Sequence, residues 1–457
     1  MYKIDFNHPC HIHFIGIGGI SMSGLAEILL NEGFTVSGSD FKQSALTDHL
    51  TSKGAKVFYG QKASNISGQI DLVVYTAAIH EDNEEFMEVK RQGIPMLTRA
   101  ELLGQLMTNY RLPIAVSGTH GKTTTTSMLS HIFLSADADP TISVGGILKA
   151  IGGNIRVGNS EIFITEACEY TNSFLSFFPK ISIILNIDAD HLDFFKDIDD
   201  IRNSFHEFGK LLPKDGTLII NGEIEQIEAV TKDLTCNIIT FGKKEGCTYR
   251  AENIIYDNLG NASFDVIKEG MPVRRITLSV GGEHNVYNAL SAIAVADLLD
   301  VSEEALKEGL LSFHGTDRRF QYKGEFNGVT VIDDYAHHPT EIAATLKTAA
   351  HYPHREIWCI FQPHTYTRTK ALFDEFAEAL TNVDHLILAD IYAARETDTL
   401  GVSSEQLADK IKALGCDAIY LPDFETIENY VRSHCQSGDL LITMGAGDVV
   451  NIGESLL

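Results

Sequence analysis

The chain has 457 residues, of which 44% are hydrophobic and 21% are charged, and its formal net charge is −26. A single hydrophobic core stops growing at about 250 to 300 residues, so this length predicts two to four domains. So acidic a chain repels phosphate backbones and anionic membrane surfaces, which argues against a nucleic-acid role.

The cysteine pattern favours a reducing compartment, and the hydropathy pattern argues against export and membrane insertion. Seven cysteines are scattered along the chain without a C-x-x-C pair, which predicts neither a disulfide framework nor a zinc site. The amino-terminal residues lack an apolar targeting segment, and no run approaches the roughly 18 apolar residues of a membrane span. We therefore expect a cytoplasmic protein without membrane insertion, either a monomer or a homodimer.

The first predicted domain, residues 1–111, alternates apolar strands with helical patterns. Strands are predicted at 11–16, 34–38 and 72–76, with a helix that ends near Gly33. This βαβ rhythm is typical of a parallel, doubly wound α/β sheet.

A glycine-rich loop joins the first predicted strand to the first predicted helix, and its glycines are Gly16, Gly18 and Gly19. Such a loop lets a diphosphate approach a helix amino terminus, and Asp40, at the end of the next strand, is placed to hold a ribose. Ser21 stands where the third glycine of the dinucleotide fingerprint would be, so the loop fits a diphosphate ligand in general better than NAD. The alternative is a tight turn without a ligand.

The second predicted domain, residues 112–316, has expected strands at 114–117, 162–165, 181–186 and 217–221 and expected helices at 285–299 and 303–311. A short form of the P-loop follows its first strand and comprises Gly118, Thr119, His120, Gly121, Lys122, Thr123 and Thr124. Backbone N–H groups of such a loop bind phosphate oxygens, with Lys122 on the β- and γ-phosphates and the Thr123 hydroxyl on Mg²⁺. A glycine turn with a surface lysine is the alternative.

Two further strand ends of this domain carry candidate metal ligands. Glu166 ends one apolar strand, and His191 follows another. Residues at the carboxyl ends of parallel strands converge on the ligand crevice, so both side chains can reach a phosphate-bound Mg²⁺ or Mn²⁺. Each alone is also compatible with an ordinary polar group at a strand end.

Asn285 and Asn288 lie three residues apart, on one face of a predicted helix. Their amides can pair with an adenine edge, although Asn285 as a helix cap is the alternative. Arg319 offers a cation for phosphate charge, with a surface salt bridge as the alternative.

The third predicted domain, residues 317–457, has expected strands at 329–334, 357–362, 386–390 and 439–445. The first of these strands delivers three polar side chains to a loop, namely Asp334, Tyr335 and His337. Such a density of polar groups at a strand end favours a functional site over solvated loop residues.

In their order along the chain, these motifs resemble those of the Mur ligases of bacterial peptidoglycan synthesis. The resemblance spans about residues 11 to 448, and its carriers are His13-Phe-Ile-Gly-Ile-Gly-Gly19, Arg99-Ala-Glu101, Gly118-Thr-His-Gly-Lys-Thr-Thr124, Asp190-His-Leu-Asp193, Gly282-Glu-His-Asn-Val-Tyr-Asn-Ala289, Arg318-Arg-Phe320, Asp333-Asp-Tyr-Ala-His-His-Pro-Thr-Glu341 and Gln362-Pro-His364. It implies three α/β domains: a Rossmann-like domain for a UDP-sugar, a central ATPase domain with a mainly parallel sheet, and a Rossmann-like carboxyl-terminal domain that closes over the site.

The resemblance also implies an activity of the alanine-adding branch. ATP, with Mg²⁺ or Mn²⁺, would phosphorylate the carboxylate of UDP-N-acetylmuramate, and L-alanine would attack the acyl phosphate. Carried over by motif, the catalytic residues would be Lys122, Arg319 and His337, and the ATP-binding residues would be the phosphate loop 118–124, Asn285, Asn288, Arg319 and Asp334. The metal ligands would be Thr123, Glu166 and His191. The UDP-sugar would meet Gly16, Gly18, Gly19, Ser21, Asp40 and Thr76, and the amino acid or sugar acid would meet Tyr335, His337 and Arg368.

Some residues depart from the family pattern. Ser21 replaces a glycine, Thr365 stands where many members have a second arginine, and the segment Thr165–Tyr170 is less acidic than in relatives. The neighbourhood of Phe205 and His206 lacks the lysine that several sister ligases carbamylate, as expected for the alanine-adding branch. Three alternatives stay open: a sister ligase for another amino acid or a recycled peptide, an NAD-dependent dehydrogenase, and an ATP-sensing binding protein.

Overall fold

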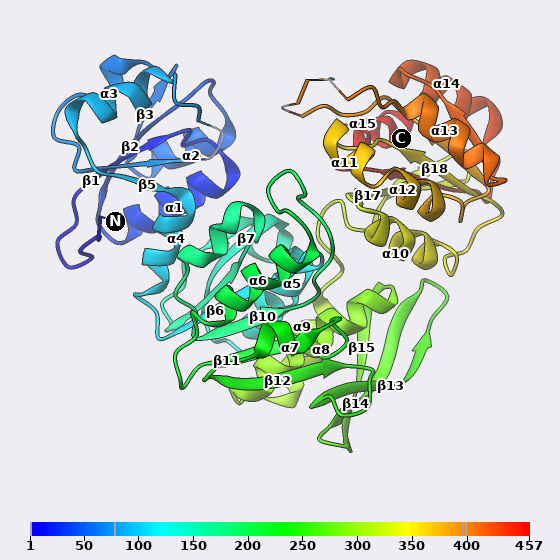
Figure 1. The fold of residues 1–457 in the computed structure, drawn as a ribbon, viewed down its shortest axis with the longest axis horizontal. Helices are drawn as coiled ribbons and strands as arrows, with labels where there is room; N and C mark the ends of the chain where they lie inside the picture. Colours follow the sequence, from blue (N-terminus) through cyan, green and yellow to red (C-terminus); the bar gives the residue numbers. More distant parts are fainter. Residues whose placement is uncertain (1, 77–78, 395, 398–399) are drawn as a thin grey trace.

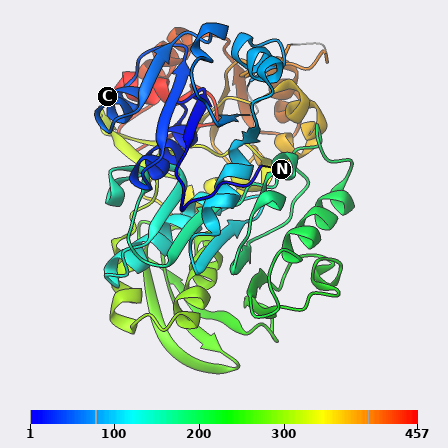
Figure 2. The ribbon, with the colours of Figure 1, turned by 90° about the vertical axis from the view of Figure 1, so that its left-hand side faces the viewer.

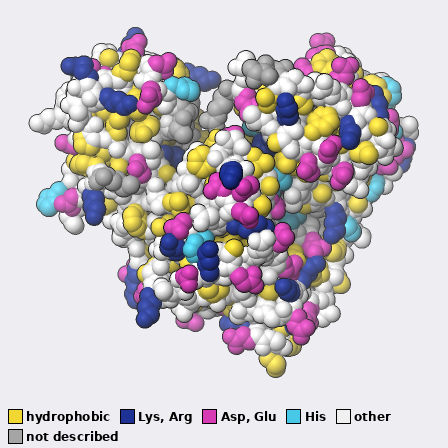
Figure 3. Space-filling view, in the orientation of Figure 1, with side chains coloured by type: hydrophobic (Ala, Val, Ile, Leu, Met, Phe, Trp, Pro, Cys, Tyr) yellow, Lys and Arg dark blue, Asp and Glu magenta, His cyan; other side chains and the backbone are white. Residues whose placement is uncertain are grey.

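The computed structural model describes residues 2–76, 79–394, 396–397 and 400–457 and forms three α/β domains, each built around its own sheet (Figure 1). The central domain lies below, and the amino-terminal and carboxyl-terminal domains stand side by side above it (Figures 1 and 2). Acidic side chains are spread over all three domains on the face drawn in Figure 3, in keeping with the net charge. Among the described helices, none is long and apolar enough to cross a membrane.

The amino-terminal domain is a five-stranded parallel sheet in the order β3-β2-β1-β4-β5. This order is typical of doubly wound nucleotide-binding folds. Its elements are β1 (His11–Ile15), α1 (Ile20–Asn31), β2 (Thr35–Asp40), α2 (Ala45–Ser52), β3 (Lys56–Tyr59), η1 (Ala63–Asn65), β4 (Leu72–Tyr75), α3 (Glu84–Gln92), β5 (Met96–Thr98) and α4 (Arg99–Met107).

The central domain has a ten-stranded sheet in the order β15-β14-β13-β12-β11-β10-β6-β9-β7-β8. Its middle is parallel, while β13 to β15 and the hairpin of β7 and β8 add antiparallel edges. Its elements are β6 (Leu112–Ser117), α5 (Lys122–Ser135), β7 (Thr141–Leu148), η2 (Lys149–Ile151), β8 (Gly153–Arg156), β9 (Ile162–Glu166), η3 (Tyr170–Ser176), β10 (Ile181–Ile184), α6 (Ile198–Gly209), β11 (Thr217–Asn221), α7 (Ile227–Thr231), β12 (Asn237–Gly242), β13 (Tyr249–Tyr256), β14 (Asn261–Lys268), β15 (Met271–Gly281), α8 (Glu283–Leu298) and α9 (Glu303–Ser312).

The carboxyl-terminal domain has a six-stranded sheet in the order β16-β17-β21-β18-β19-β20, parallel except for β16. Its elements are β16 (Gln321–Phe326), β17 (Val329–Asp334), α10 (Pro339–Ala349), β18 (Ile357–Phe361), α11 (Tyr366–Ala371), α12 (Phe373–Ala379), β19 (His385–Leu388), α13 (Ser404–Ala413), β20 (Asp417–Tyr420), α14 (Phe424–His434), β21 (Leu440–Met444) and α15 (Val450–Leu456).

The expected strands and helices are present, with ends that differ by a few residues. Strand β10 ends at Ile184, two residues earlier than expected. Just beyond it, the Asn186 side chain accepts a hydrogen bond from the backbone N–H of His120 at 2.7 Å and donates one to its carbonyl at 3.0 Å. Helix α8 begins at Glu283 with Gly282 as its N-cap, so the alternative in which Asn285 caps the helix is wrong. The domain boundaries near 111 and 316 stay a prediction.

The apolar cores show how the domains are joined. One cluster of buried residues runs from the amino-terminal domain into the central domain and includes Phe14, Leu25 and Leu103 together with Phe174 and Phe205. The clusters around Ile332 and Val329 are built from the carboxyl-terminal domain. The first two domains therefore share apolar packing.

Candidate nucleotide and ligation site

The phosphate loop lies between a strand that is buried over Pro113–Ser117 and a helix. Strand β6 ends at Ser117, Gly118 and Gly121 have φ of +141° and +85°, and α5 begins at Lys122. The position of Gly121 favours glycine for two reasons. Its positive φ is disfavoured for residues with a side chain, and a Cβ atom there would come within 2.6 Å of Asn288 Oδ1. The loop thus leaves the amino terminus of α5 exposed to a phosphate.

Lys122 is held by the loop and by one buried carboxylate. Its Nζ donates to the carbonyls of Gly118 and Thr119 at 2.5 and 3.0 Å, and it contacts Glu169 Oε2 at 2.9 Å. Burial by itself lowers the pKa of Lys122, but the Glu169 carboxylate outweighs it and the pKa is raised. The loop therefore carries a permanent cation.

The predicted metal ligands separate into two groups. Glu166 Oε2 accepts from the Thr123 hydroxyl at 3.1 Å, and Oε1 accepts from the Gly145 N–H at 2.5 Å. His191 instead lies 3.8 Å from Glu169 Oε1, and burial lowers the pKa of its imidazole, which keeps it neutral. Glu169, to which sequence reasoning assigned no role, is therefore the carboxylate that faces both Lys122 and His191.

These residues fit a metal that is bound mainly through phosphate. Within the described ranges, no group of three or more His, Cys, Asp and Glu residues is arranged to hold an ion by itself. Mg²⁺ commonly takes one or two protein ligands and completes its shell with phosphates and water. The Thr123 hydroxyl, the neutral His191 imidazole and the buried Glu169 carboxylate are groups that can supply these few protein ligands.

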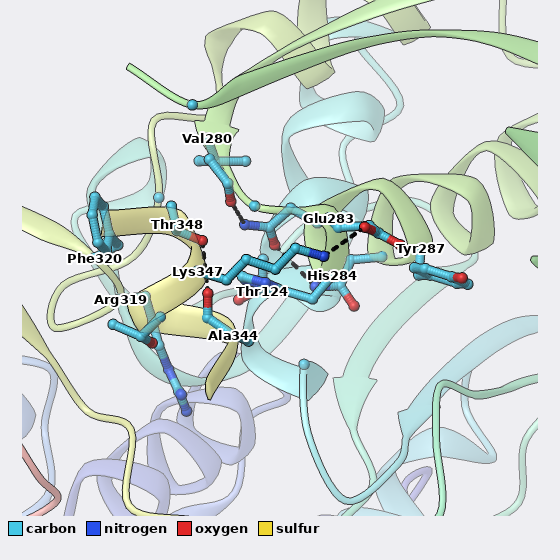
Figure 4. Close-up of a pocket in the computed structure, with 18 of the residues that line it drawn as sticks. Thr124, Val280, Glu283, His284, Tyr287, Arg319, Phe320, Ala344, Lys347 and Thr348 are labelled. Carbon is cyan, nitrogen blue, oxygen red and sulfur yellow. Dashed lines mark hydrogen bonds and ion pairs between the residues drawn. The ribbon is translucent and has the colours of Figure 1, made fainter. Parts of the chain in front are cut away.

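A cavity of about 700 Å³ opens beside the loop, between the central and carboxyl-terminal domains. The phosphate loop, α8, the segment after α9 and α10 all line it, and Figure 4 shows residues of α8 and α10 facing each other across it. Lys347 of α10 reaches Glu283 of α8, with Nζ 3.0 Å from Oε2.

The two asparagines of α8, Asn285 and Asn288, line this cavity. Asn288 Nδ2 donates to Asn285 Oδ1 at 3.0 Å, and Asn285 Nδ2 donates to the Gly281 carbonyl at 2.6 Å. These two hydrogen bonds connect the end of β15 through Asn285 to Asn288, whose Oδ1 lies beside Gly121 of the phosphate loop. Their role with adenine stays a prediction.

Arg319 and Asp334 reach the same cavity from the third domain. Asp334 accepts from the N–H groups of Phe320 and Ala336 at 2.8 and 2.7 Å, which holds the turn around Arg319, and burial raises the pKa of Asp334 to about 6. The Arg319 guanidinium lies 5.4 Å from the centre of the Tyr335 ring.

A second cavity of about 380 Å³ lies between the loop 189–193 and α11. Arg368 lines it, with Nε 3.2 Å from Asp190 Oδ1 and Nη1 3.2 Å from His364 Nδ1. His337 lies close by, with its ring centre 6.0 Å from that of His364, and burial lowers its pKa to about 4. Arg368 and His337 are thus brought together at the edge of the central domain.

The first glycine loop forms a separate site in the amino-terminal domain. Gly16 has φ +85° and packs near Thr76, Gly19 is the N-cap of α1, and Ser21 lies in the first turn of that helix. Asp40 Oδ2 accepts from the Gly18 N–H at 2.8 Å, so its carboxylate supports the loop from within. The six predicted residues therefore gather around one helix amino terminus.

Sequence reasoning missed three carboxylates of the site. Glu169, Asp188 and Glu341 pair with cations of the phosphate loop, at Lys122 in the first case and at His120 in the other two. The sequence indicated these carboxylates only indirectly, because a lysine or histidine that is buried beside a loop needs a partner of opposite charge.

Comparison with known proteins places these features in a family. Three family descriptions match: "Mur ligase family, catalytic domain" at residues 11–111, "Mur ligase middle domain" at 116–296 and "Mur ligase, glutamate ligase domain" at 318–447. The chain is 62% identical to the UDP-N-acetylmuramate–L-alanine ligase of Lachnospira eligens and 61% identical to that of Agathobacter rectalis, with complete coverage of both proteins.

The fold is similar to solved structures as well. The UDP-N-acetylmuramate–alanine ligase of Thermotoga maritima superposes with a TM-score of 0.80, at 29% identity and 98% coverage of each chain. A murein peptide ligase of Psychrobacter arcticus superposes with a TM-score of 0.71, at 26% identity and 98% coverage of each chain.

Proposed function

We propose how the residues of this chain, which belongs to the Mur ligase family, carry out the ligation of L-alanine to the carboxylate of UDP-N-acetylmuramate. The chain is an ATP-dependent ligase of peptidoglycan precursor synthesis, as its full-length relatives at 61–62% identity indicate. This membership overturns the dehydrogenase alternative. We expect the reaction in the cytoplasm, where ATP is available.

The phosphate loop is the ATP end of the site in this proposal. The observation that carries it is the partly buried Lys122, held at the amino terminus of α5 beside a cavity large enough for a nucleotide. The adenine would lie against Asn285 and Asn288, and the phosphates would meet Lys122 and Arg319. Because carboxylate and phosphate repel each other, these two cations would lower the barrier mainly by offsetting charge and fixing position.

Mg²⁺, or Mn²⁺, would be held by Thr123 and His191 together with Glu166 or Glu169, and it would neutralise charge on the transferred phosphoryl group. Glu169 has the better position, since it already faces His191 and Lys122. Glu166 would then orient the Thr123 hydroxyl.

The amino acid would enter from the side of the third domain. Arg368, which lines the second cavity, would bind the carboxylate of alanine. The neutral His337 would stand beside His364, which lines that cavity too, and Tyr335 would lie near the phosphates. The acyl phosphate hydrolyses readily, so docking of the carboxyl-terminal domain over the site would protect it by excluding water. The UDP group would occupy the first glycine loop.

A coupled ADP-release assay tests the proposal. Phosphate and ADP should appear only when UDP-N-acetylmuramate, ATP, Mg²⁺ and L-alanine are all present. Lys122→Met should reduce turnover at least ~10³-fold, because it removes the cation of the loop. Equal turnover with D-glutamate or a tripeptide would favour a sister ligase, and the absence of ADP with every acceptor would favour an ATP-sensing protein.

A further inference from the structure

Glu341, in the first turn of α10, is a mostly buried carboxylate that links two domains. Its side chain is 11% exposed, and its Oε1 lies 3.1 Å from Nδ1 of His120 in the phosphate loop. The same oxygen lies 3.5 Å from Arg319 Nη1, and Oε2 accepts from the His337 N–H at 3.1 Å. One side chain of the third domain thus contacts the phosphate loop and a predicted phosphate-binding arginine together.

His120 completes this contact from the central domain. Its other ring nitrogen, Nε2, lies 3.1 Å from Asp188 Oδ2, so the imidazole stands between two carboxylates. Burial by itself lowers the pKa of His120, but Glu341 and Asp188 outweigh it and raise the pKa to about 9. At neutral pH the contact is therefore a line of alternating charges from Asp188 through His120 and Glu341 to Arg319.

The charges suit a positioning role at this place. Asp188, His120, Glu341 and Arg319 all line the large cavity, so the line of charges forms part of the wall that would face the phosphates. A carboxylate there repels phosphate, so it weakens nucleotide binding unless it contributes something else. Glu341 contacts both Arg319 and His120, so it fixes the position of the arginine relative to the loop that would bind the phosphates.

We propose that Glu341 is a positioning residue for phosphoryl transfer, which binds His120 and Arg319 at once and so sets the arginine against the phosphate loop when the carboxyl-terminal domain docks. This inference rests on the proposed use of the large cavity for ATP. It assigns Glu341 no contact with a reacting atom. Its effect on the reaction passes through Arg319 and through the docking of the domain.

The first test is Glu341→Gln, which keeps the size of the side chain and removes its charge. We expect kcat to fall at least ~30-fold while KM for ATP stays within ~3-fold, because the arginine would be misplaced in the transition state rather than lost. Turnover is expressed per nucleotide-binding site, counted with a fluorescent ATP analogue. A merely structural role would lower the number of sites and leave turnover per site unchanged, which would overturn the proposal.

A matched control comes from the same domain. Glu454→Gln removes the same charge from an exposed pair with Lys323, and its kcat and KM should equal those of the unchanged protein. A comparable loss in this control would show that the effect of Glu341→Gln is not specific, and the proposal would fail.

His120→Gln tests the contact from its other end. If both residues act through one contact, the double variant should be within ~3-fold of Glu341→Gln, whereas losses that multiply would overturn the proposal. Should Glu341→Gln not fold, judged by circular dichroism, His120→Gln alone decides: an unchanged kcat contradicts the inference. If the unchanged protein does not ligate L-alanine, the proposed function fails; if it does and both variants keep full kcat, only the inference fails.

Discussion

At the scale of single residues, the site depends on which carboxylate faces which cation. Glu166 and Glu169 are three residues apart, yet Glu166 binds a hydroxyl and a backbone N–H while Glu169 binds Lys122. A buried cation that loses its partner is costly, so these two carboxylates should not be interchangeable.

Substitution of the two glutamates should separate their roles. Glu169→Gln should weaken Mn²⁺ binding in the presence of ADP by about tenfold, because it removes the carboxylate that faces both His191 and Lys122. Glu166→Gln should have a smaller effect, since an amide oxygen can still accept from Thr123. The Mn²⁺ affinity of each variant is measured from the electron paramagnetic resonance signal of free Mn²⁺. A larger loss of affinity in Glu166→Gln than in Glu169→Gln would show that Glu166 is the direct ligand.

His120 should make stability depend on pH in the neutral to alkaline range. Its pKa of about 9 in the folded protein exceeds its ordinary value of 6.5, so protonation favours folding. The contribution is complete below about pH 6.5 and is lost as the pH rises through about 9. The Tm difference between the unchanged protein and His120→Gln should therefore shrink steadily over that range in scanning calorimetry. A difference that is constant from pH 6 to 9.5 would contradict this assignment.

At the scale of elements, α4 joins the first two domains through a close backbone contact. The helix begins with a capping box, in which Thr98 accepts from the Glu101 N–H and Glu101 accepts from the Thr98 N–H. Further along, Gly104 faces η3 so closely that a Cβ atom would come within 1.9 Å of the Ser176 carbonyl oxygen. The absence of a side chain at Gly104 permits this packing.

Gly104→Ala should therefore destabilise the protein by about 2 kcal/mol, because the steric cost exceeds the gain in helix propensity. Gly153→Ala is the matched control, since nothing lies within 4 Å of the Cβ position there. Thermal unfolding should show a lower Tm for the first variant and little change for the second. An unchanged Tm in Gly104→Ala would show that η3 can move away without loss.

At the scale of the whole molecule, the two interfaces of the central domain differ in kind. The amino-terminal domain shares an apolar cluster with it, whereas the carboxyl-terminal domain meets it through polar contacts. His338 Nε2 lies 3.2 Å from the Ala189 carbonyl, next to the pairs made by Asp188 and Asp190. Polar interfaces of this kind favour relative domain motion, so the third domain is the one expected to move.

Arg368→Gln should shift the third domain away from the central one. The change removes the ion pair with Asp190, so we expect a larger radius of gyration in small-angle X-ray scattering and a higher KM for L-alanine. Lys410→Gln is the control, because its pair with Asp374 lies within the carboxyl-terminal domain. An unchanged radius of gyration in Arg368→Gln would mean that the remaining contacts hold the domain in place.

Much of the architecture was predictable because it depends on local patterns. Alternating apolar segments indicated parallel sheets, and glycines after buried strands indicated the loops at Gly16 and Gly118. The hairpin of β7 and β8 and the antiparallel strands β13 to β15 were not predicted, although Gly145 and the glycines near position 281 contribute to the site. Their sequences lack the strand and helix alternation on which the prediction depended.

What the sequence determined by itself was the chemistry of the chain: a phosphate loop with Lys122, paired asparagines at helical spacing and a polar strand end at Asp334, in the order typical of one ligase family. Only the tertiary structure decided the pairing of charges, such as Glu169 with Lys122 and Glu341 with His120 and Arg319. The reason is physical: motifs depend on residues that are close in sequence, whereas the partner of a buried charge is set by which strands and domains meet in space.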